Sequence, residues 1–372
     1  MADWLIVGAG FTGATLAERI AKRLGQSVHI LDQRPHLGGN AYDYLNSAGI
    51  RVHKYGPHLF HTNSKKIWDY VQAFSKWTPY THHVLAKIDQ NLAPVPFNFN
   101  TIEALLPASQ AQALIARLET HFPKDARIAV LSLRQHEDAQ LRAFGDFVYE
   151  KLFAHYTMKQ WGLSPDELAA SVTARVPVLM GRDNRYFQDR YQALPADGYT
   201  SMFENMLRHP KIKLSLNVDY HSLAKSELAP KIIYTGPIDR YFDYCFGPLP
   251  YRSLNFVEEI TTGAPQAAGT INYPGKEPFT RVTEMTLLTG AVGDRLTRIR
   301  EFPQAHLPGV NEPYYPIPRA ETAALYQKYA ALARKTKGTY FCGRLANYRY
   351  YNMDQAIAAA LTLFQRRILR GG

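Results

Sequence analysis

The stretch WLIVGAGFTG, residues 4–13, decides the fold of this chain. Its first four residues form an apolar run without polar alternation, which is typical of a parallel strand buried on both faces. Three glycines follow in the spacing G-x-G-x-x-G, and an amphipathic helical pattern continues to Leu24. A second apolar strand, residues 27–31, ends at Asp32. This opening predicts a strand–helix–strand unit of the doubly wound α/β class.

The glycine spacing between a strand and a helix predicts a dinucleotide site. Gly8, Gly10 and Gly13 allow a tight turn and let a pyrophosphate approach the N-terminus of the following helix. Asp32 follows about 20 residues later, where an acid accepts hydrogen bonds from ribose hydroxyl groups. A glycine turn without a ligand is the alternative, and the surrounding strand, helix and acid argue against it.

The segment RPHLGGN, residues 34–40, favours FAD over a nicotinamide cofactor. A basic residue followed by a glycine pair directly after the second strand is typical of FAD proteins, in which this loop also wraps the pyrophosphate. No second G-x-G-x-x-G follows a strand, so we expect no separate NAD(P)H domain.

Composition limits the remaining classes. The chain has 372 residues, of which 46% are hydrophobic and 20% charged, ordinary values for a globular protein of two or three domains. Two cysteines are too few for a disulfide framework, so a reduced, cytoplasmic protein is expected. No stretch approaches the roughly 20 apolar residues that cross a bilayer, and no targeting pattern precedes the first strand. The 43 Lys and Arg against 32 Asp and Glu give a net charge of +11, which favours anionic ligands.

The pattern changes several times beyond residue 75. Residues 76–100 have the composition of strands and turns, residues 101–172 are mostly helical in period, and residues 176–200 predict a loop with extended segments. Short β-rich stretches at 211–220 and 231–235 precede an alternating region at 250–305, which predicts an antiparallel sheet. Two amphipathic helices are expected at 321–335 and 354–369. Since no linker separates these regions, the domains are predicted to be discontinuous and interleaved.

Three histidines lie within nine residues in VHKYGPHLFHT, residues 52–62. Such a cluster first suggests a metal site, but no cysteine or carboxylate lies among the histidines, and Gly56 and Pro57 bend the chain. We favour a loop that faces the flavin, with histidines of an ordinary core as the alternative. Neutral imidazoles beside a flavin can accept hydrogen bonds without adding a formal charge.

Isolated arginines and many tyrosines indicate a diphosphate pocket. Arg175, Arg281 and Arg344 stand among apolar or turn residues rather than in charged runs. A buried arginine needs an anionic partner, and a diphosphate offers bidentate acceptors. Solvated surface arginines are the alternative at each position. The tyrosines that would complete the pocket are Tyr186, Tyr314, Tyr315, Tyr348 and Tyr350.

Two further segments suit the same site. The helical segment at 150–162 carries Phe153, Tyr156 and Trp161, which fit core packing and base stacking equally well. From residue 341 to 358 the pattern predicts strand, loop and helix. In flavoproteins such a segment brings a second helix N-terminus to the flavin, where its dipole stabilises negative charge.

Taken together, these segments resemble the UDP-galactopyranose mutase family over nearly the whole chain. YTGPID, NEPYYP and the segment GRL…YRY…MD are specific to that family, whereas the glycine pattern is generic. The other matching stretches are IVGAGFTG, RPHLGGN, HKYGPHLFHT, YTMKQWG, SVTARVP, LPYRSL and FTRVTE.

The resemblance implies an α/β protein with an FAD-binding Rossmann-like domain, an inserted helical domain and an antiparallel β-sheet domain. The first would comprise residues 1–75, 212–243 and 318–372, the second residues 101–180 with a mobile loop, and the third residues 76–100, 181–211 and 244–317. Bacterial members are usually cytoplasmic homodimers that supply galactofuranose for polysaccharide biosynthesis. An external reductant such as NAD(P)H is implied, whereas nucleic-acid binding, a metal and membrane insertion are not.

The implied reaction interconverts UDP-galactopyranose and UDP-galactofuranose and needs reduced FAD. Flavin N5 would displace UDP from the anomeric carbon and form an N5–sugar covalent adduct. The sugar ring of this adduct would open and close again through another hydroxyl group, and the sugar would then be transferred back to UDP. By resemblance, the catalytic residues are His61, Arg175 and Arg281. The cofactor residues would be Gly8, Gly10, Thr12, Gly13, Asp32, Gly39, Asn40, His58, Gly343, Arg344, Asn352 and Met353. The substrate residues would be Phe153, Tyr156, Thr157, Trp161, Arg175, Tyr186, Arg281, Tyr315, Arg344 and Tyr350.

Three places depart from the family pattern. Asn352 stands where the family often has an acid, Leu179 where a basic residue can occur, and residues 285–290 replace a more polar stretch. Cofactor and reaction are expected to survive these changes, but a UDP-GalNAc or dTDP-fucose mutase would share nearly every motif. A redox flavoenzyme of the amine oxidase type would have an apolar substrate cavity instead. A nucleic-acid-binding module would need a basic stripe, whereas the lysines and arginines here are scattered.

Overall fold

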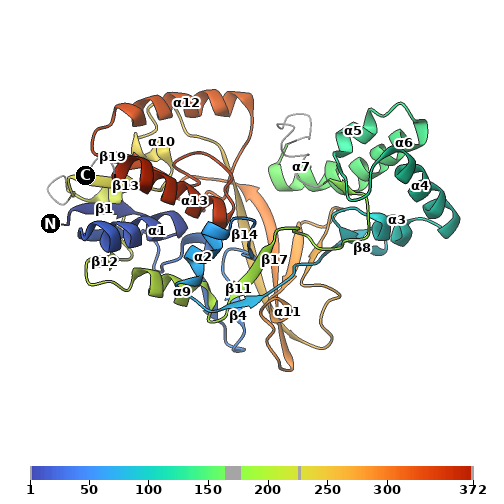
Figure 1. The fold of residues 1–372 in the computed structure, drawn as a ribbon, viewed down its shortest axis with the longest axis horizontal. Coiled ribbons are helices and arrows are strands. Elements are labelled where there is room, and N and C mark those ends of the chain that lie inside the picture. The colour runs from blue at the N-terminus through green and yellow to red at the C-terminus, as the bar shows by residue number, and fades with distance from the viewer. Residues whose placement is uncertain (1, 164–176, 225–227, 370–372) are drawn as a thin grey trace.

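The structure, a computed structural model, describes residues 2–163, 177–224 and 228–369. A parallel sheet with its helices lies at one end of the molecule, an antiparallel sheet in the middle and a helical unit at the other end (Figure 1).

The N-terminal strand is the centre of a five-stranded parallel sheet. β1 (Trp4–Val7) pairs with β2 (Val28–Leu31) on one side and with β13 (Lys231–Tyr234) on the other. β12 (Ile212–Ser215) and β19 (Thr339–Phe341) form the edges, so the order is β12-β2-β1-β13-β19. All neighbours run parallel, as the non-alternating apolar strands require. The predicted doubly wound unit is confirmed.

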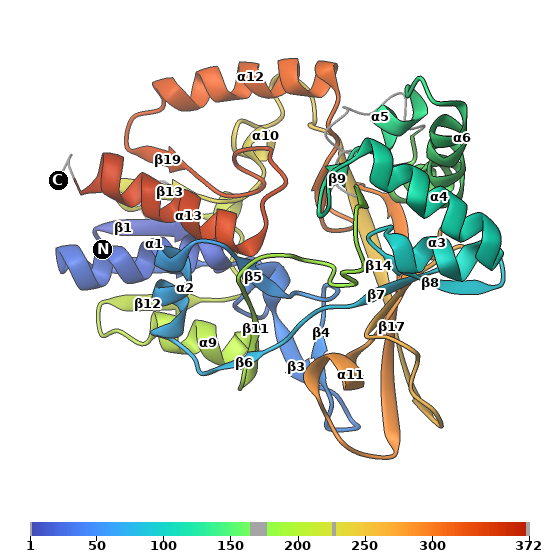
Figure 2. The same cartoon turned by 45° about the vertical axis from the view of Figure 1, so that its right-hand side comes forward.

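Helices cover this sheet and bury its apolar side chains. α1 (Phe11–Arg19) packs against α13 (Met353–Leu363). Each of the two continues into a π-helical turn, at Ile20–Leu24 and Phe364–Ile368 respectively. The helices predicted at 321–335 and 354–369 are confirmed, the first as α12 (Ala320–Lys335). α12 crosses above the short α10 (Ile238–Tyr241) in both views (Figures 1 and 2).

Helix α9 (Gly198–Leu207) is one of the elements on this side of the molecule that the sequence did not predict. It follows directly after the segment predicted as extended. Its Tyr199 and Phe203 are fully buried, and the Phe203 ring lies 4.7 Å from the ring of Phe11 on α1. Contacts with distant segments therefore stabilise this helix, and a local pattern does not reveal them.

The middle of the molecule is a seven-stranded sheet in the order β18-β14-β17-β16-β15-β7-β8. Its neighbours are antiparallel except β15 and β7, which run parallel. The antiparallel sheet predicted at 250–305 is confirmed. The strands are β7 (Val84–Ile88), β8 (Asn91–Val95), β14 (Tyr251–Thr262), β15 (Thr270–Asn272), β16 (Arg281–Glu284), β17 (Arg295–Ala305) and β18 (Tyr315–Pro316).

Smaller elements join the two large sheets. β5 (Phe60–Thr62), β11 (Tyr191–Pro195) and β6 (Trp77–Pro79) form a three-stranded antiparallel sheet in that order. β3 (Asp43–Leu45) and β4 (Arg51–His53) form a hairpin. Near them lie α2 (Lys65–Gln72), α11 (Met285–Thr289) and a 3₁₀ turn, Gly39–Ala41. A second 3₁₀ turn, Tyr220–Ser222, packs against the parallel sheet.

The helical unit projects from the edge of the seven-stranded sheet (Figure 2). It shares a buried apolar cluster with β7 and β8, and the mainly helical pattern predicted from residue 101 is confirmed as far as residue 163. Its elements are α3 (Phe99–Leu105), α4 (Ala108–His121), α5 (Val130–Arg134), α6 (Ala139–Val148), a π-helical segment (Tyr149–Ala154), α7 (His155–Trp161), and the paired strands β9 (Arg127–Ile128) and β10 (Val178–Leu179). The division into three domains at the boundaries given above stays a prediction.

Candidate active site

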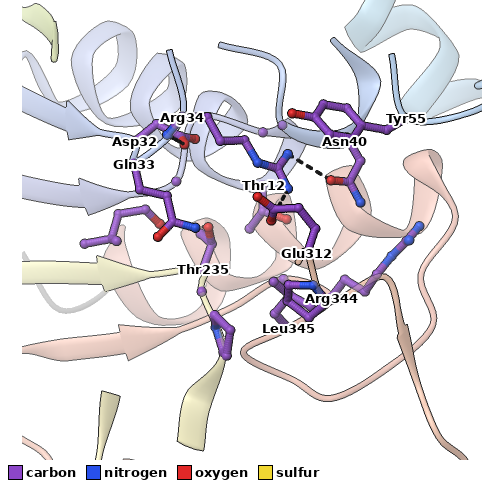
Figure 3. Close-up of a pocket in the computed structure, with 18 of the residues that line it drawn as sticks. Thr12, Asp32, Gln33, Arg34, Asn40, Tyr55, Thr235, Glu312, Arg344 and Leu345 are labelled. Atoms are coloured by element: carbon purple, nitrogen blue, oxygen red, sulfur yellow. Dashed lines mark hydrogen bonds and ion pairs between the residues drawn. The ribbon is translucent and has the colours of Figure 1, made fainter. Parts of the chain in front are cut away.

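A large cavity opens at the carboxyl edge of the parallel sheet, where doubly wound folds bind dinucleotides, and a smaller one lies between the helical unit and the antiparallel sheet. The large cavity has a volume of about 970 Å³. Its walls come from the ends of β1, β2 and β13, the first residues of α1 and α13, and the loop of residues 308–313 (Figure 3). The fold therefore gathers segments far apart in the sequence around one space.

Three glycines form the turn between β1 and α1. Gly8 has a φ of +103°, which favours glycine, and a Cβ there would lie 2.1 Å from Thr235 Oγ1. A Cβ on Gly13 would lie 1.9 Å from the carbonyl oxygen of Gly8, so this glycine lets the helix pack on the turn. A Cβ on Gly10 would lie 3.6 Å from Cα of Gly39. Gly10 and Gly39 thus present bare backbone to the cavity.

Asp32 holds this turn in place. Its Oδ2 accepts a hydrogen bond from the backbone N–H of Ala9 at 2.8 Å, and its Oδ1 accepts one from the N–H of Arg34 at 2.9 Å. A carboxylate has about four lone-pair sites, so two acceptor positions remain on a side chain that lines the cavity. Asp32 therefore fixes the loop and keeps capacity for ribose hydroxyl groups.

Arg34 crosses the cavity wall between two partners (Figure 3). Its Nη1 donates to Asn40 Oδ1 at 2.9 Å, its Nη2 donates to Glu312 Oε2 at 2.6 Å, and its guanidinium lies over the Tyr55 ring at 4.5 Å. Burial opposes the charged form, but the hydrogen bond and charge of Glu312 raise the pKa of Arg34 above its usual value. This cation joins the loop after β2 to the loop before β18.

The segment after β19 completes the same cavity. Gly343 has a φ of +113°, and a Cβ there would lie 3.2 Å from Thr12 Oγ1. At the start of α13, the backbone N–H of Asn352 donates to Gln355 Oε1 at 3.0 Å, and both Asn352 and Met353 line the cavity. The N-termini of α1 and α13 therefore face one space, where their partial positive charges favour an anion.

The clustered histidines have different partners. His58 Nδ1 lies 2.8 Å from the carbonyl oxygen of Gly56, and because a carbonyl only accepts, this nitrogen carries the proton. Its Nε2 is then left as an acceptor. The backbone N–H of His58 donates to His53 Nδ1 at 3.0 Å. Burial lowers the pKa of His58 to about 3, so a neutral imidazole lines the cavity.

His61 lies elsewhere. Its Nδ1 is 2.6 Å from Asp189 Oδ2, and its ring stacks on Phe187 with centroids 3.7 Å apart. His61 lines neither cavity. In the described part of the chain, no group of three or more His, Cys, Asp or Glu side chains is arranged to bind a metal ion.

The smaller cavity, of about 170 Å³, lies between the helical unit and the antiparallel sheet. Its walls contain every described substrate candidate except Arg344, which lines the larger cavity. The predicted residues that line the smaller cavity are Phe153, Tyr156, Thr157, Trp161, Tyr186, Arg281, Tyr315 and Tyr350. Residues from five distant segments are thus brought together, and Arg175 lies outside the described residues.

Arg281 supplies the positive charge of this cavity. It starts β16, and its Nη2 donates to the hydroxyl of Tyr156 at 2.9 Å. Its Nε lies 3.4 Å from Glu301 Oε2. Burial opposes the charged form of Arg281, but the charge of Glu301 raises the pKa of the guanidinium well above its usual value. Arg281 is therefore a permanent cation in a mostly aromatic pocket.

Aromatic rings link the two cavities. The Trp161 ring lies 6.0 Å from that of Tyr315, which in turn stacks on Tyr350 at 5.2 Å. The guanidinium of Arg344 lies 5.0 Å from the Tyr350 ring, and its Nη2 donates to the carbonyl oxygen of Tyr351 at 2.6 Å. Arg344 has no carboxylate partner among the described residues. It is a cation available at the boundary between the two spaces.

Two basic residues that the sequence analysis did not single out hold α7 against the sheet. Lys159 donates to the carbonyl oxygens of Tyr273, Glu277 and Phe279. Arg252 on β14 donates from Nε to the carbonyl oxygen of Gln160 at 3.0 Å. The loop and helix end that they join also contribute Pro274 and Gln160 to the smaller cavity. The only signal in the sequence is that both lie inside stretches that match a family.

The cofactor candidates also gather as predicted. All line the larger cavity except Gly13, which packs α1 against the turn. Thr235 and Gly236 line it as well, although the sequence analysis did not name them. Their position directly after β13, at the carboxyl edge of the sheet, is the signal that could have identified them.

Sequence models of two families match the chain: UDP-galactopyranose mutase at residues 151–350 and an NAD(P)-binding Rossmann-like domain at residues 6–74. A probable UDP-galactopyranose mutase of Klebsiella pneumoniae is 35% identical over 365 residues, covering 96% of this chain and 92% of the relative. A dTDP-fucopyranose mutase of Escherichia coli is 34% identical over 374 residues, covering 97% of each chain.

A solved structure shares the fold. The crystal structure of a reduced UDP-galactopyranose mutase superposes with a TM-score of 0.77 and 18% sequence identity, and the alignment covers 100% of this chain and 97% of the other. The predicted combination of a Rossmann-like sheet, helices and an antiparallel sheet is therefore confirmed. No helix in residues 2–163, 177–224 or 228–369 combines the length and apolar character needed to cross a membrane.

Proposed function

Because this chain belongs to the UDP-galactopyranose mutase family, we propose that it is an isomerase that interconverts UDP-galactopyranose and UDP-galactofuranose with reduced FAD. The observation that carries this proposal is the pair of neighbouring cavities, whose walls meet where Arg344 contacts Tyr350. The larger one has the glycine turn and two helix N-termini of a dinucleotide site, and the smaller one has Arg281 among aromatic side chains. Arg344 and Tyr350 lie at their boundary.

The larger cavity fits FAD on its own geometry. Gly10 and Gly39 leave bare backbone where a Cβ would narrow the space, and the start of α1 offers unpaired N–H groups to a pyrophosphate. Asp32 would accept ribose hydroxyl groups, and the positive end of α13 would stabilise negative charge on a reduced ring. Bound reduced FAD would supply a nucleophilic nitrogen, N5, to the anomeric carbon of the sugar.

The smaller cavity would bind the uridine diphosphate. Tyr156 and Trp161 offer rings for stacking on uracil, and Phe153 and Thr157 complete that wall. Arg281 would bind the diphosphate, because its remaining N–H groups match phosphate oxygens in a bidentate arrangement. Tyr186, Tyr315 and Tyr350 would donate hydrogen bonds to the same oxygens. We assign Arg175 to the diphosphate as well, on the family resemblance alone.

The sugar would then lie at the boundary of the cavities. Arg344 has no carboxylate partner among the described residues and would hold the charge of the phosphate next to the sugar. Neutral His58 would accept a hydrogen bond at Nε2 from a hydroxyl group of the sugar. His61 stays a catalytic candidate on the resemblance alone.

Several finer proposals rest on the family alone. We propose the three-domain division given above, a loop around Arg175 that closes over substrate, a cytoplasmic homodimer, and NAD(P)H as reductant. The product would feed galactofuranose into polysaccharide biosynthesis.

A related substrate is the second candidate. The dTDP-fucopyranose mutase is 34% identical to this chain, nearly the same as the 35% of the galactose enzyme. The pocket residues named here would serve either nucleotide, because they recognise a ring, a diphosphate and a sugar.

One assay tests the proposal and separates the two substrates. Purified protein is reduced with dithionite and given UDP-galactofuranose or dTDP-fucofuranose, and the products are separated by chromatography. We expect a yellow protein that converts UDP-galactofuranose only after reduction, because only reduced N5 is nucleophilic. Full activity without reductant would contradict the covalent mechanism. Conversion of the fucose substrate alone would move the enzyme to the second candidate, and a colourless protein would contradict the FAD assignment.

A further inference from the structure

Two buried ion pairs join β16 to β17 with opposite polarity. Arg281 on β16 lies directly opposite Glu301 on β17, and Glu284 on β16 lies directly opposite Arg298 on β17. The nitrogen–oxygen distances are 3.4 Å and 3.0 Å. Both carboxylates are buried, with side chains 3% and 0% exposed. Only the first pair has a member that lines a cavity, since Arg281 does and Arg298 does not.

Glu301 lies between that cavity and the histidine loop. A Cβ on Gly56 would lie 3.2 Å from Glu301 Oε1 and 2.9 Å from Cε1 of Phe256, the residue opposite Glu301 on β14. One carboxylate oxygen therefore faces Arg281 and the other faces the loop that carries His58. Tyr156, Tyr314 and Tyr315 lie near enough to interact electrostatically with Glu301. The Glu301 side chain is 3% exposed, so water screens its charge less than at the surface. Burial raises the pKa of Glu301, and the charge of Arg281 opposes this rise and favours the carboxylate.

The guanidinium of Arg281 keeps free donors on the cavity side. An arginine has five N–H donors. One bonds the hydroxyl of Tyr156, and the buried Nε, although 3.4 Å from Glu301, has no partner with hydrogen-bond geometry in the described residues. Glu301 thus sits behind the guanidinium as a compensating charge. Glu301 therefore leaves the terminal N–H groups of the guanidinium available to a diphosphate.

We propose that Glu301 is a positioning residue that balances the charge of Arg281 and thereby limits how tightly the pocket holds a diphosphate. This inference rests on the proposed function, in which the diphosphate of a UDP-sugar binds at Arg281. A carboxylate behind the guanidinium reduces the positive potential at the diphosphate site. An enzyme that must bind a substrate and then release a product with the same diphosphate gains turnover from this restraint, because uniform tight binding does not speed the chemical step.

The test compares the two glutamates by the same change. Glu301→Gln keeps the size and an acceptor oxygen but removes the charge, and Glu284→Gln does the same in the matched pair away from the cavities. UDP binding to the FAD-loaded proteins is measured by isothermal titration calorimetry. We expect Glu301→Gln to lower the Kd for UDP about tenfold, the effect of removing one charge roughly 8 Å from one phosphate charge at an effective dielectric constant of about 30. The KM for the UDP-sugar should fall with it, and Glu284→Gln should leave both unchanged.

A third variant keeps the proposal testable if Glu301→Gln does not fold. Glu301→Asp keeps the charge, so its Kd for UDP should stay within about twofold of the wild type. If Glu301→Gln does not fold, a Kd for Glu301→Asp outside that range overturns the proposal, and a Kd inside it supports charge balance. An unchanged or weaker affinity in a folded Glu301→Gln overturns the inference while the proposed function stands. Absence of UDP binding by the wild type overturns both.

Discussion

At the scale of single residues, Gly10 is a glycine that the ligand requires and the backbone conformation does not. Its φ of −82° suits any residue, and a Cβ would meet Gly39 only at an ordinary contact distance of 3.6 Å. We therefore expect Gly10→Ala to fold with an unchanged melting temperature as apoprotein. Its affinity for FAD should fall at least about tenfold, because the new methyl group stands where the pyrophosphate approaches the backbone.

Fluorescence titration of FAD into apoprotein measures this effect. Gly181→Ala is the matched control, since that glycine also lacks a positive φ and lines neither cavity. Normal FAD affinity in Gly10→Ala would mean that the pyrophosphate lies elsewhere.

Residues that the backbone conformation requires could be predicted from the sequence. Gly8, Gly10 and Asp32 were found because their spacing follows from the geometry of a strand–helix turn. Arg281 was noticed as an isolated arginine that suits a diphosphate, but its pairing with Tyr156 could not be predicted, because nothing local in the sequence joins residue 156 to residue 281. The sequence did not indicate a role for Glu301, because that role depends on the strand register that places it opposite Arg281. The placement of His61 against Asp189 likewise depends on a strand pairing across the chain.

At the scale of elements, α7 brings stacking side chains to the pocket and Lys159 holds it there. Lys159→Met would remove the bonds to the carbonyl oxygens of residues 273, 277 and 279. We expect UDP affinity to fall about fivefold or more, because the loop that carries Pro274 would no longer be fixed to the helix. FAD content should stay normal, since no part of α7 lines the larger cavity.

Lys151→Met is the matched control for this element. Lys151 lies in the π-helical segment that precedes α7, and its Nζ donates to the exposed Asp89. Loss of this exposed ion pair should leave UDP binding unchanged. Equal losses in the two variants would show that charge on the helix matters and that its attachment does not.

Helices and strands were predictable where their pattern is local. The amphipathic period of α12 and the apolar run of β1 suffice on their own. α9 was not expected, because its burial depends on Phe11 and on strands far away in the sequence. The turn of π-helix before α7 has no sequence signature either, and it places Phe153 on the pocket wall.

At the scale of the whole molecule, burial of neutral histidines makes stability depend on pH. Burial lowers the pKa of His53 to about 4 and those of His58 and His82 to about 3, against a usual value near 6.5. The unfolded chain therefore binds more protons below pH 6.5. Their contribution to stability is present above that pH and is lost as the pH falls toward 4, by about 1.4 kcal/mol per pH unit for each fully buried histidine.

Thermal denaturation of the protein at pH 7.5 and 5.5 checks this expectation. The melting temperature should fall at the lower pH, and His82→Gln should show a smaller fall because one of the three groups is gone. His155→Gln removes an exposed histidine and should behave like the wild type. An identical fall in His82→Gln would exclude this histidine as a source.

The order of strands in the parallel sheet has a consequence for how the protein is made. β1 and β2 leave the ribosome first, yet they pair with β12 and β13 from after residue 211, and β19 arrives only at residue 339. The cavity that Gly8 and Gly10 line therefore cannot form before Gly343 and the start of α13 are synthesised. During that time the edges of the first two strands are open to wrong partners. Nascent chains of this protein should therefore depend on chaperones, and flavin binding should follow the synthesis of Gly343 and the start of α13.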